Sequence, residues 1–224
     1  MNVWLDHLVV GAATLDDGVA WCERTLGVSP GPGGRHALMG THNRLLKLSS
    51  PAFEDCYLEI VAVEAEAPPP GRPRWFGLDG SELQAQLQAQ GPRLLHCVAR
   101  SPQLDMHRWG LIAVGYQPGD PQRLGRDTPQ GRLEWDMLLR PDGQPQCGGA
   151  LPTLMQWQGR HPTADLPDSG VALRSLALCG FHERARDVLR IRGVQVLPIA
   201  EAGRVPALQA LLDTPLGPVE LRSG

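Results

Sequence analysis

The sequence predicts an α+β fold built from three consecutive βαβββ-like passes, with mixed, curved sheets and the helices outside them. Two kinds of observation support this prediction. Runs typical of a first strand recur as LDHLVV, LLHCVA and LRSLAL, and runs typical of a last strand recur as YLEIV, LMQWQ and VELRS. The 26 glycines and 21 prolines are spread along all 224 residues, which favours many short elements joined by turns over long helical bundles.

The first pass is expected to occupy residues 1–64. It opens with VWLDHLVV, a run rich in β-branched residues whose two-residue period places His7 on the same face as its apolar neighbours. A helix is expected next, because Thr14 can serve as its N-cap, acidic residues follow in the first turn, and Gly27 can stop it.

Two further strands are expected in this pass, at 43–48 and 56–63, after a turn-rich segment. In the second of them Glu59 shares a face with Tyr57 and Val61. A carboxylate on such a face is costly to bury unless a cation, a metal ion or a hydrogen-bond donor meets it. Glu59 is therefore a candidate site residue.

A Pro-rich connector with a short helix is expected over residues 65–92, the helix beginning at Ser81 and ending at Gly91. The second pass is expected over 93–162. It begins with the strand LLHCVAR and continues with a helix and the strands RLEWDMLL and PTLMQWQ. The third pass is expected over 168–223, with the strand VALRSLAL, the helix-like segment FHERARDVLRIRG and three more strands.

Composition excludes several classes of protein. With 21 Lys plus Arg against 24 Asp plus Glu, the net charge is −3, so neither nucleic acid nor an anionic membrane is an expected partner. No run is long enough to span a membrane, no secretory signal is expected, and the five cysteines are widely spaced and odd in number, which is typical of a cytoplasmic protein. No dinucleotide loop, phosphate-binding loop or G-x-S-x-G elbow is present in the sequence.

If each pass contributes one curved sheet, residues in echoing positions of first and last strands converge on one cavity. These positions are His7 and Glu59 in the first pass, His96 and Gln156 in the second, and Ser175 and Glu220 in the third. Two imidazoles and one carboxylate form a set suited to Fe(II), Mn(II), Ni(II) or Zn(II). The alternative for each histidine is an ordinary hydrogen-bonded core residue.

The chain resembles the glyoxalase-like proteins of the vicinal oxygen chelate superfamily, which also includes extradiol dioxygenases and bleomycin-resistance proteins. The resemblance lies in LDHLVVGAATLDDGVAWCERTLGV, GGRHALMGTHNRLLKL and YLEIVAV, with LLHCVAR and LPTLMQWQGRHP beyond them. It implies paired modules that form an open, U-shaped barrel. It also implies a divalent metal ion (Zn, Ni, Fe or Mn) held by His7, Glu59, His96 and Gln156.

This resemblance implies a metal-dependent glyoxalase-type lyase or isomerase, or a dioxygenase, that acts on a small substrate with vicinal oxygens. Glu59 would be a ligand or the catalytic base. Gln156 stands where superfamily members generally have Glu, and Glu220 could replace it. The alternative function is a non-catalytic protein that binds or sequesters a small molecule. A homodimer would be consistent with either function.

Four further residues are candidates for substrate binding. His42 and Asn43 belong to a segment, GTHN, that resembles a recurring part of the glyoxalase-like group, although it could equally be a polar turn. Trp135 and Trp157 are expected in strands, as pocket wall or core. The connector segment 72–76 could either face an anionic substrate or pack over the barrel mouth.

Overall fold

The computed structural model describes residues 2–223, and within this range it contains four α-helices and twelve strands. The first pass consists of β1 (Trp4–Gly11), α1 (Leu15–Leu26), β2 (Arg35–His36), β3 (Thr41–Lys47) and β4 (Tyr57–Val63). The second consists of β5 (Arg93–Arg100), α3 (Leu104–Ala113), β6 (Asp120–Thr128), β7 (Gly131–Leu139) and β8 (Thr153–Trp157). The third consists of β9 (Ala172–Cys179), α4 (Glu183–Leu189), β10 (Val194–Leu197), β11 (Leu208–Thr214) and β12 (Gly217–Arg222).

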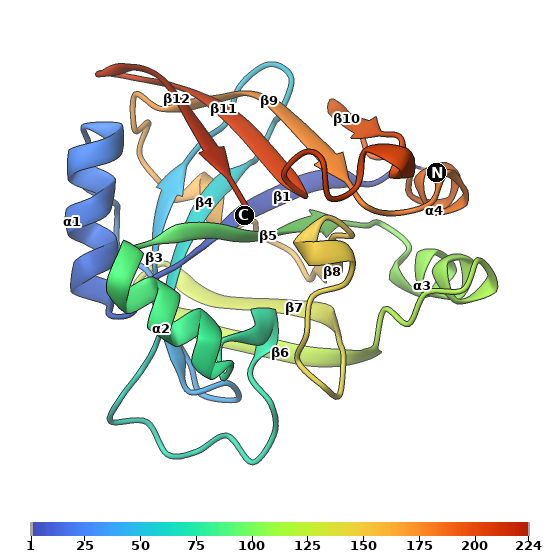
Figure 1. The fold of residues 1–224 in the computed structure, drawn as a ribbon. Coiled ribbons are helices and arrows are strands. Elements are labelled where there is room, and N and C mark those ends of the chain that lie inside the picture. Colours follow the sequence, from blue (N-terminus) through green and yellow to red (C-terminus); the bar gives the residue numbers. More distant parts are fainter. Residues whose placement is uncertain (1, 224) are drawn as a thin grey trace.

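The first two passes form one eight-stranded sheet, in the order β2-β3-β4-β1-β5-β8-β7-β6. β1 and β5 pair antiparallel at its centre, and each also pairs in parallel with the last strand of its own pass. The sheet curls into an open barrel whose edge strands, β2 and β6, are not hydrogen-bonded to each other (Figure 1). The predicted α+β class, with βαβββ passes and an open barrel, is confirmed.

The third pass repeats the order of elements but not the pairing. Its four-stranded sheet has the order β10-β9-β11-β12, so β10, the strand after the helix, takes the parallel position beside β9. In the barrel, the last strand of each pass takes that position beside the first. β12 is consequently an edge strand of the second sheet, and it contacts the barrel from outside, at β5.

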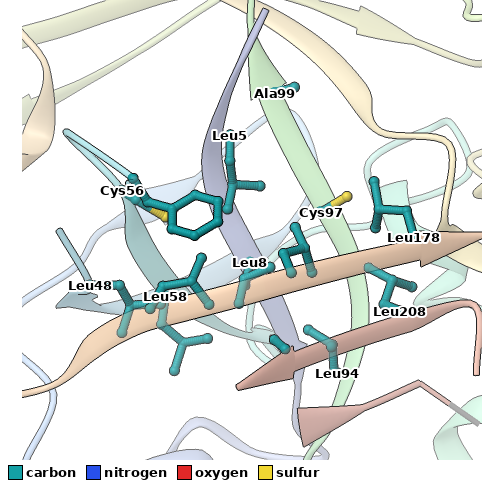
Figure 2. Close-up of a cluster of buried hydrophobic side chains, with 14 of the residues drawn as sticks. Leu5, Leu8, Leu48, Cys56, Leu58, Leu94, Cys97, Ala99, Leu178 and Leu208 are labelled. Atoms are coloured by element: carbon teal, nitrogen blue, oxygen red, sulfur yellow. The ribbon is translucent and has the colours of Figure 1, made fainter. Parts of the chain in front are cut away.

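The central strands of the barrel are buried on both faces. One face carries Leu5, Leu8, Leu58 and their neighbours, which pack against Leu178 and other residues of the four-stranded sheet (Figure 2). The other face lines the barrel interior, where a second apolar cluster includes Val9, Val61, Val98, Trp135 and Met155. This double burial explains why almost every residue of β1 and β4 is buried, with no alternation of buried and exposed positions.

The signals predicted for the first helix are confirmed. Thr14 is the N-cap, its hydroxyl accepts a hydrogen bond from the Asp17 amide, and Gly27 ends the helix in the left-handed conformation. The start of α2 (Ser81–Gln90) differs from the prediction, because the N-cap is Gly80 and Ser81 is already helical.

Two barrel strands were not located in the sequence: β2, which has only two residues, and β6. β6 follows a turn-rich segment, contains Pro and Gly, and is half exposed as an edge strand, so it lacks the apolar run that marks a buried strand. The five cysteines are free thiols, and Cys147 is the one that is partly exposed among them. Between residues 2 and 223 no helix is both long and apolar enough to cross a bilayer.

Candidate functional site

A small cavity lies inside the barrel, between the two halves of the eight-stranded sheet. Its water-accessible volume is about 30 Å³, which is room for one or two water molecules. The walls combine aromatic and thioether side chains with a few polar groups. The lining residues include His7, His36, Asn43, Glu59, Arg126, Trp135 and Trp157.

His7 is held by the residue that precedes it. Its Nδ1 donates to the carboxylate of Asp6 at 2.7 Å, and its ring stacks on Tyr57 with the centroids 4.6 Å apart. The predicted shared face holds for His7 and Val9 but is wrong for Leu5, which packs in the outer cluster because a register shift in the β1–β5 ladder lies between Leu5 and His7. Because Nδ1 carries the donated proton, Nε2 is left as the reactive nitrogen of this ring.

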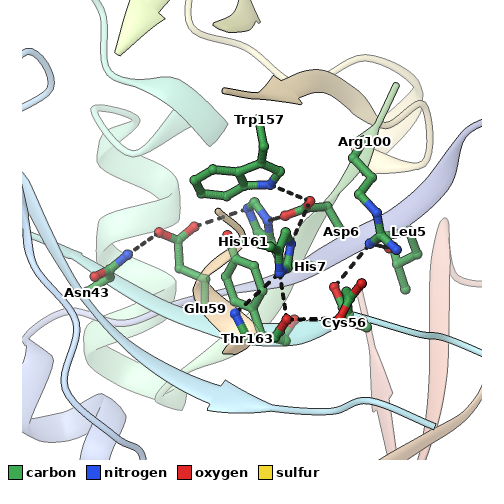
Figure 3. A network of polar contacts seen from close by, with 12 residues as sticks. Leu5, Asp6, His7, Asn43, Cys56, Glu59, Arg100, Trp157, His161 and Thr163 are labelled. Carbon is green, nitrogen blue, oxygen red and sulfur yellow. Dashed lines mark hydrogen bonds and ion pairs between the residues drawn. The ribbon is translucent and has the colours of Figure 1, made fainter. Parts of the chain in front are cut away.

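Asp6 is fully buried and accepts hydrogen bonds from three rings. Besides His7, the Trp157 indole donates at 2.8 Å and His161 Nε2 donates at 3.1 Å (Figure 3). Burial alone raises the pKa of this carboxyl group, but the hydrogen bonds and charges of His161 and His7 outweigh it and hold the pKa well below its usual range. Asp6 is thus a fixed negative charge behind His7.

Glu59 faces His7 across the cavity. One carboxylate oxygen accepts from Asn43 Nδ2 at 2.6 Å, and the other lies 3.6 Å from His7 Nε2. The second distance is too long for a direct hydrogen bond. His7 Nε2 and the second oxygen of Glu59 therefore lie side by side at one small cavity, where neighbouring atoms of a ligand can contact both.

His36 is a third imidazole at this site, and it was not predicted as a site residue. Its Nε2 lies 3.9 Å from Glu59 and accepts from Asn43, and its Nδ1 bonds the Thr41 hydroxyl. Burial lowers the pKa of His36 to about 4, against the opposing effect of Glu59. His36 points inward because β2 pairs with β3 in a short hairpin formed by GGRHALMGTH. Recognising this hairpin in the sequence would have placed His36 at the site.

His96 lies on the same interior face, but both its nitrogens are engaged by protein groups. Nδ1 donates to the Gly149 carbonyl at 2.8 Å, and Nε2 accepts from the Thr153 amide at 3.1 Å. Burial lowers the pKa of His96 to about 4. The ring is neutral at neutral pH and has no free lone pair for a ligand.

The strand ladders identify the true counterpart of Glu59. Val9 of β1 pairs with Glu59, and Val98 of β5 pairs with Thr153. Thr153 also contacts His96 Nε2 through its hydroxyl at 2.8 Å, as Glu59 approaches His7. The second half of the barrel therefore carries a hydroxyl where the first half carries a carboxylate.

Gln156 and Glu220 both lie away from the cavity. The Gln156 side chain accepts from the Leu104 amide at the start of α3, on the opposite face of β8 from Met155 and Trp157. Glu220 is exposed on β12 and paired with Arg222 at 2.6 Å. The prediction of Gln156 as a ligand is wrong because the last strands were aligned in the wrong register. The alternative, Glu220, is also wrong, because the different strand pairing of the third pass places β12 at an edge outside the barrel.

Three of the four predicted substrate-binding residues line the cavity: Asn43, Trp135 and Trp157. His42 is not among its walls; it lies beside Asn43 in β3, which is a strand and not a polar turn.

The Pro-rich connector closes the cavity. Trp75 and Phe76, in a short 3₁₀ turn (Trp75–Gly77), are almost fully buried, and their rings pack against His36 and His96, respectively. Phe76 has a φ of 58°, an unfavourable value for a bulky residue. It also borders a cleft of about 890 Å³ outside the barrel, so it separates this cleft from the inner cavity.

The four side chains predicted to hold a divalent metal ion do not converge on one point. Of these four, only His7 and Glu59 lie close together. Both ring nitrogens of His96 are hydrogen-bonded to Gly149 and Thr153, and the Gln156 side chain faces α3. In the part of the chain from residue 2 to residue 223, no three His, Cys, Asp or Glu side chains gather in an arrangement able to hold a metal ion. The residues present therefore do not fit the four-ligand ion site that the sequence predicted.

The buried carboxylate of Asp6 yields a stability prediction. In Asp6→Asn, the amide group opposes one of the three ring donors, which leaves a buried donor unpaired and lowers the free energy of unfolding by about 1–3 kcal/mol. Asp136→Asn is the control, since Asp136 also accepts from two side chains, Arg123 and Gln158, but near the surface. Urea denaturation should show a clearly smaller loss for the control, and equal losses would contradict the argument.

Comparisons with known proteins agree with this architecture. A family model described as a glyoxalase-like domain matches residues 5–188. Among solved structures, a hypothetical protein from Staphylococcus aureus has a TM-score of 0.55 at 15% identity, over 80% of this chain and 70% of that chain.

Two methylmalonyl-CoA epimerases have lower TM-scores. The enzyme from Mycobacterium tuberculosis has a TM-score of 0.39 at 18% identity, over 72% of this chain and 91% of that chain. A methylmalonyl-CoA epimerase in complex with methylmalonyl-CoA and NH4+ has a TM-score of 0.41 at 15% identity, over 70% and 94%. No curated protein matches the chain. At these identities the structural likeness concerns the fold.

Proposed function

The chain belongs to the glyoxalase-like domain family of the vicinal oxygen chelate superfamily, and from this premise we propose that it is an enzyme that moves a proton within a small substrate bearing vicinal oxygens. The observation that carries the proposal is the pair formed by His7 Nε2 and Glu59 Oε2, which lie 3.6 Å apart at the wall of the cavity. Glyoxalase-type isomerisation requires a base and an acid at adjacent atoms of the substrate.

Glu59 is the proposed base. Asn43 fixes one oxygen of its carboxylate, so the other oxygen is directed toward the substrate. This oxygen takes the proton from a carbon next to a carbonyl group, and the C–H electron pair moves into the new carbon–carbon double bond as charge develops on the carbonyl oxygen.

His7 is the proposed acid. In its protonated form it gives its Nε2 proton to that oxygen, which yields an enediol, and Asp6 stabilises the positive ring through Nδ1. When Glu59 returns its proton to the neighbouring carbon, the hydroxyl group on the original carbon gives its proton to His7 Nε2 and becomes the new carbonyl, which completes an isomerisation. When Glu59 returns its proton to the original carbon, the oxygen that His7 had protonated gives that proton back, which completes an epimerisation. Both side chains then have their starting protonation states. The step needs no other reactant.

The family resemblance also implies a divalent ion and, with it, glyoxalase or dioxygenase chemistry at the metal. Because the predicted ligands do not converge, the proposed mechanism uses only the groups of the chain. The second candidate function is the binding of a small molecule without chemistry. It is favoured by the apolar walls of the cavity and by its closure by Trp75 and Phe76.

Solvent-deuterium exchange tests the proposal. The purified protein is incubated in deuterated buffer with a panel of small 2-hydroxy and 2-oxo compounds and hemithioacetals, and proton NMR follows the loss of the C–H signal beside the carbonyl. We expect exchange with the wild-type chain and its loss on removal of the Glu59 carboxylate. Binding without exchange would establish the second candidate instead.

A further inference from the structure

We propose that Arg126 and Asn43 form a subsite for the carboxylate group of a small organic acid, beside Glu59 and His7. This inference rests on the proposed function and names its substrate class. Arg126 is in β6 and Asn43 is in β3, so the two residues come from opposite sides of the unsealed barrel edge. The Arg126 Nη1 donates to Asn43 Oδ1 at 3.1 Å, and both residues line the inner cavity.

Arg126 has unused hydrogen-bonding capacity. Its Nε is buried and meets no acceptor, and within residues 2–223 no carboxylate lies within ion-pair distance of its guanidinium group. Other arginines of the same hairpin are satisfied, since Arg123 pairs with Asp136 and Arg132 pairs with Asp127 and Glu134. A partly buried cation without a carboxylate partner is costly, and an anionic ligand would offset that cost.

The chain makes space for this guanidinium group. A Cβ atom at Gly34 would lie only 2.8 Å from Arg126 Nη1 and 3.0 Å from its Cδ. The Gly34 amide in turn donates to Asn43 Oδ1 at 2.8 Å. Glycine at this position therefore lets the arginine lie against the backbone, and it fixes the Asn43 amide group.

The orientation of Asn43 joins the subsite to the proposed base. Its oxygen accepts from Gly34 and Arg126, so its amino group must point to Glu59. A carboxylate bound by Arg126 would thus lie one amide group away from Glu59, with Asn43 separating the two negative charges. The carbon next to that carboxylate would then lie toward Glu59, where the proposed proton transfer takes place.

Guanidinium groups bind carboxylates with two parallel hydrogen bonds, which a neutral amide cannot match. Two matched pairs of probes use this difference: lactate with lactamide, and mandelate with mandelamide. Binding is measured by calorimetry and by tryptophan fluorescence, since Trp75, Trp135 and Trp157 line the cavity. We expect the wild-type chain to prefer each carboxylate over its amide by about tenfold or more.

Variants separate the subsite from a purely structural role of Arg126 in bridging the barrel edge. Arg126→Met should abolish the preference, and Gly34→Ala should reduce it by displacing the guanidinium group without removing its charge. Arg126→Lys should restore part of it. Arg123→Met is the control on the same strand and should keep the full preference. Thermal unfolding of each variant verifies that it is folded.

The inference is overturned if the wild-type chain shows no preference for either carboxylate, if it binds neither carboxylate at any accessible concentration, or if a folded Arg126→Met variant keeps the preference. The same measurement on Glu59→Gln distinguishes the two proposals, because this variant should keep the preference for carboxylates. A preserved preference without any deuterium exchange in the wild type would contradict the proposed function and leave the subsite standing.

Discussion

Glu59→Gln is expected to lower the rate of deuterium exchange by about 10² to 10⁴-fold, the usual contribution of a positioned general base. Glutamine has the same shape as glutamate, and its side-chain oxygen can still accept the 2.6 Å hydrogen bond from Asn43. What the variant loses is the negative oxygen that faces His7 Nε2. The expected defect is therefore chemical and not structural.

The control for this variant is Glu64→Gln. Glu64 follows the same strand but pairs with Arg35, outside the cavity, at 2.8 Å. Exchange by this control should stay close to the wild-type rate, and thermal unfolding should show both variants folded. Exchange by Glu59→Gln within a few-fold of the wild type would exclude Glu59 as the base.

The second large effect is a loss of stability in mild acid. Burial lowers the pKa values of His36 and His96 from 6.5 to about 4, so the folded chain resists protonation of these rings more than the unfolded chain does. Stability from a lowered histidine pKa is present above the unfolded value and is lost as the pH falls toward the folded value. Between pH 7 and pH 5 the loss is about 2 kcal/mol for each ring, or about 4 kcal/mol together.

Urea denaturation at several pH values measures this loss. His96→Asn removes one of the two titrating rings, so the variant should be less stable at pH 7 but lose only about half as much stability between pH 7 and pH 5. His182→Asn is the control: His182 is exposed, and asparagine can also cap α4 in place of the ring that accepts from the Arg184 amide, so this variant should still show the large loss between pH 7 and pH 5. An unfolding free energy that is constant from pH 7 to pH 5 would contradict burial of the two neutral rings.

The sequence could predict the half of the site that local strand patterns specify. His7 and Glu59 lie on two strands of the same pass that pair directly in parallel. The two-residue period correctly places Glu59 with Val61 and His7 with Val9 on the interior face. It fails for Leu5, which the register shift before His7 puts on the other face. The echo of LDHLVV in LLHCVA likewise placed His96 correctly on the interior face.

The rest of the site depends on pairing between distant strands. The similarity of YLEIV to LMQWQ made Gln156 the apparent equivalent of Glu59 in the second pass. The strand pairing shows that Thr153 is the equivalent residue. An error of one residue, or of any odd number, in the register of a strand moves a side chain to the other face of the sheet. Both faces of β8 carry a buried apolar residue, Leu154 on one and Met155 on the other, so hydrophobicity does not reveal such an error. His36 and Arg126 come from a two-residue strand and a polar edge strand, which carry little apolar pattern.

The buried pair Trp75 and Phe76 has a kinetic consequence. Any ligand larger than about two water molecules reaches His7 only in conformations where these rings have moved aside. If such open conformations make up about 1% of the population, the apparent affinity is about 100-fold weaker than the intrinsic affinity. The observed association rate should then level off at high ligand concentration, at the rate of opening, which stopped-flow tryptophan fluorescence can measure. Phe76→Gly removes the ring and relieves the unfavourable φ, so in this variant the plateau should rise and weak ligands should bind more tightly.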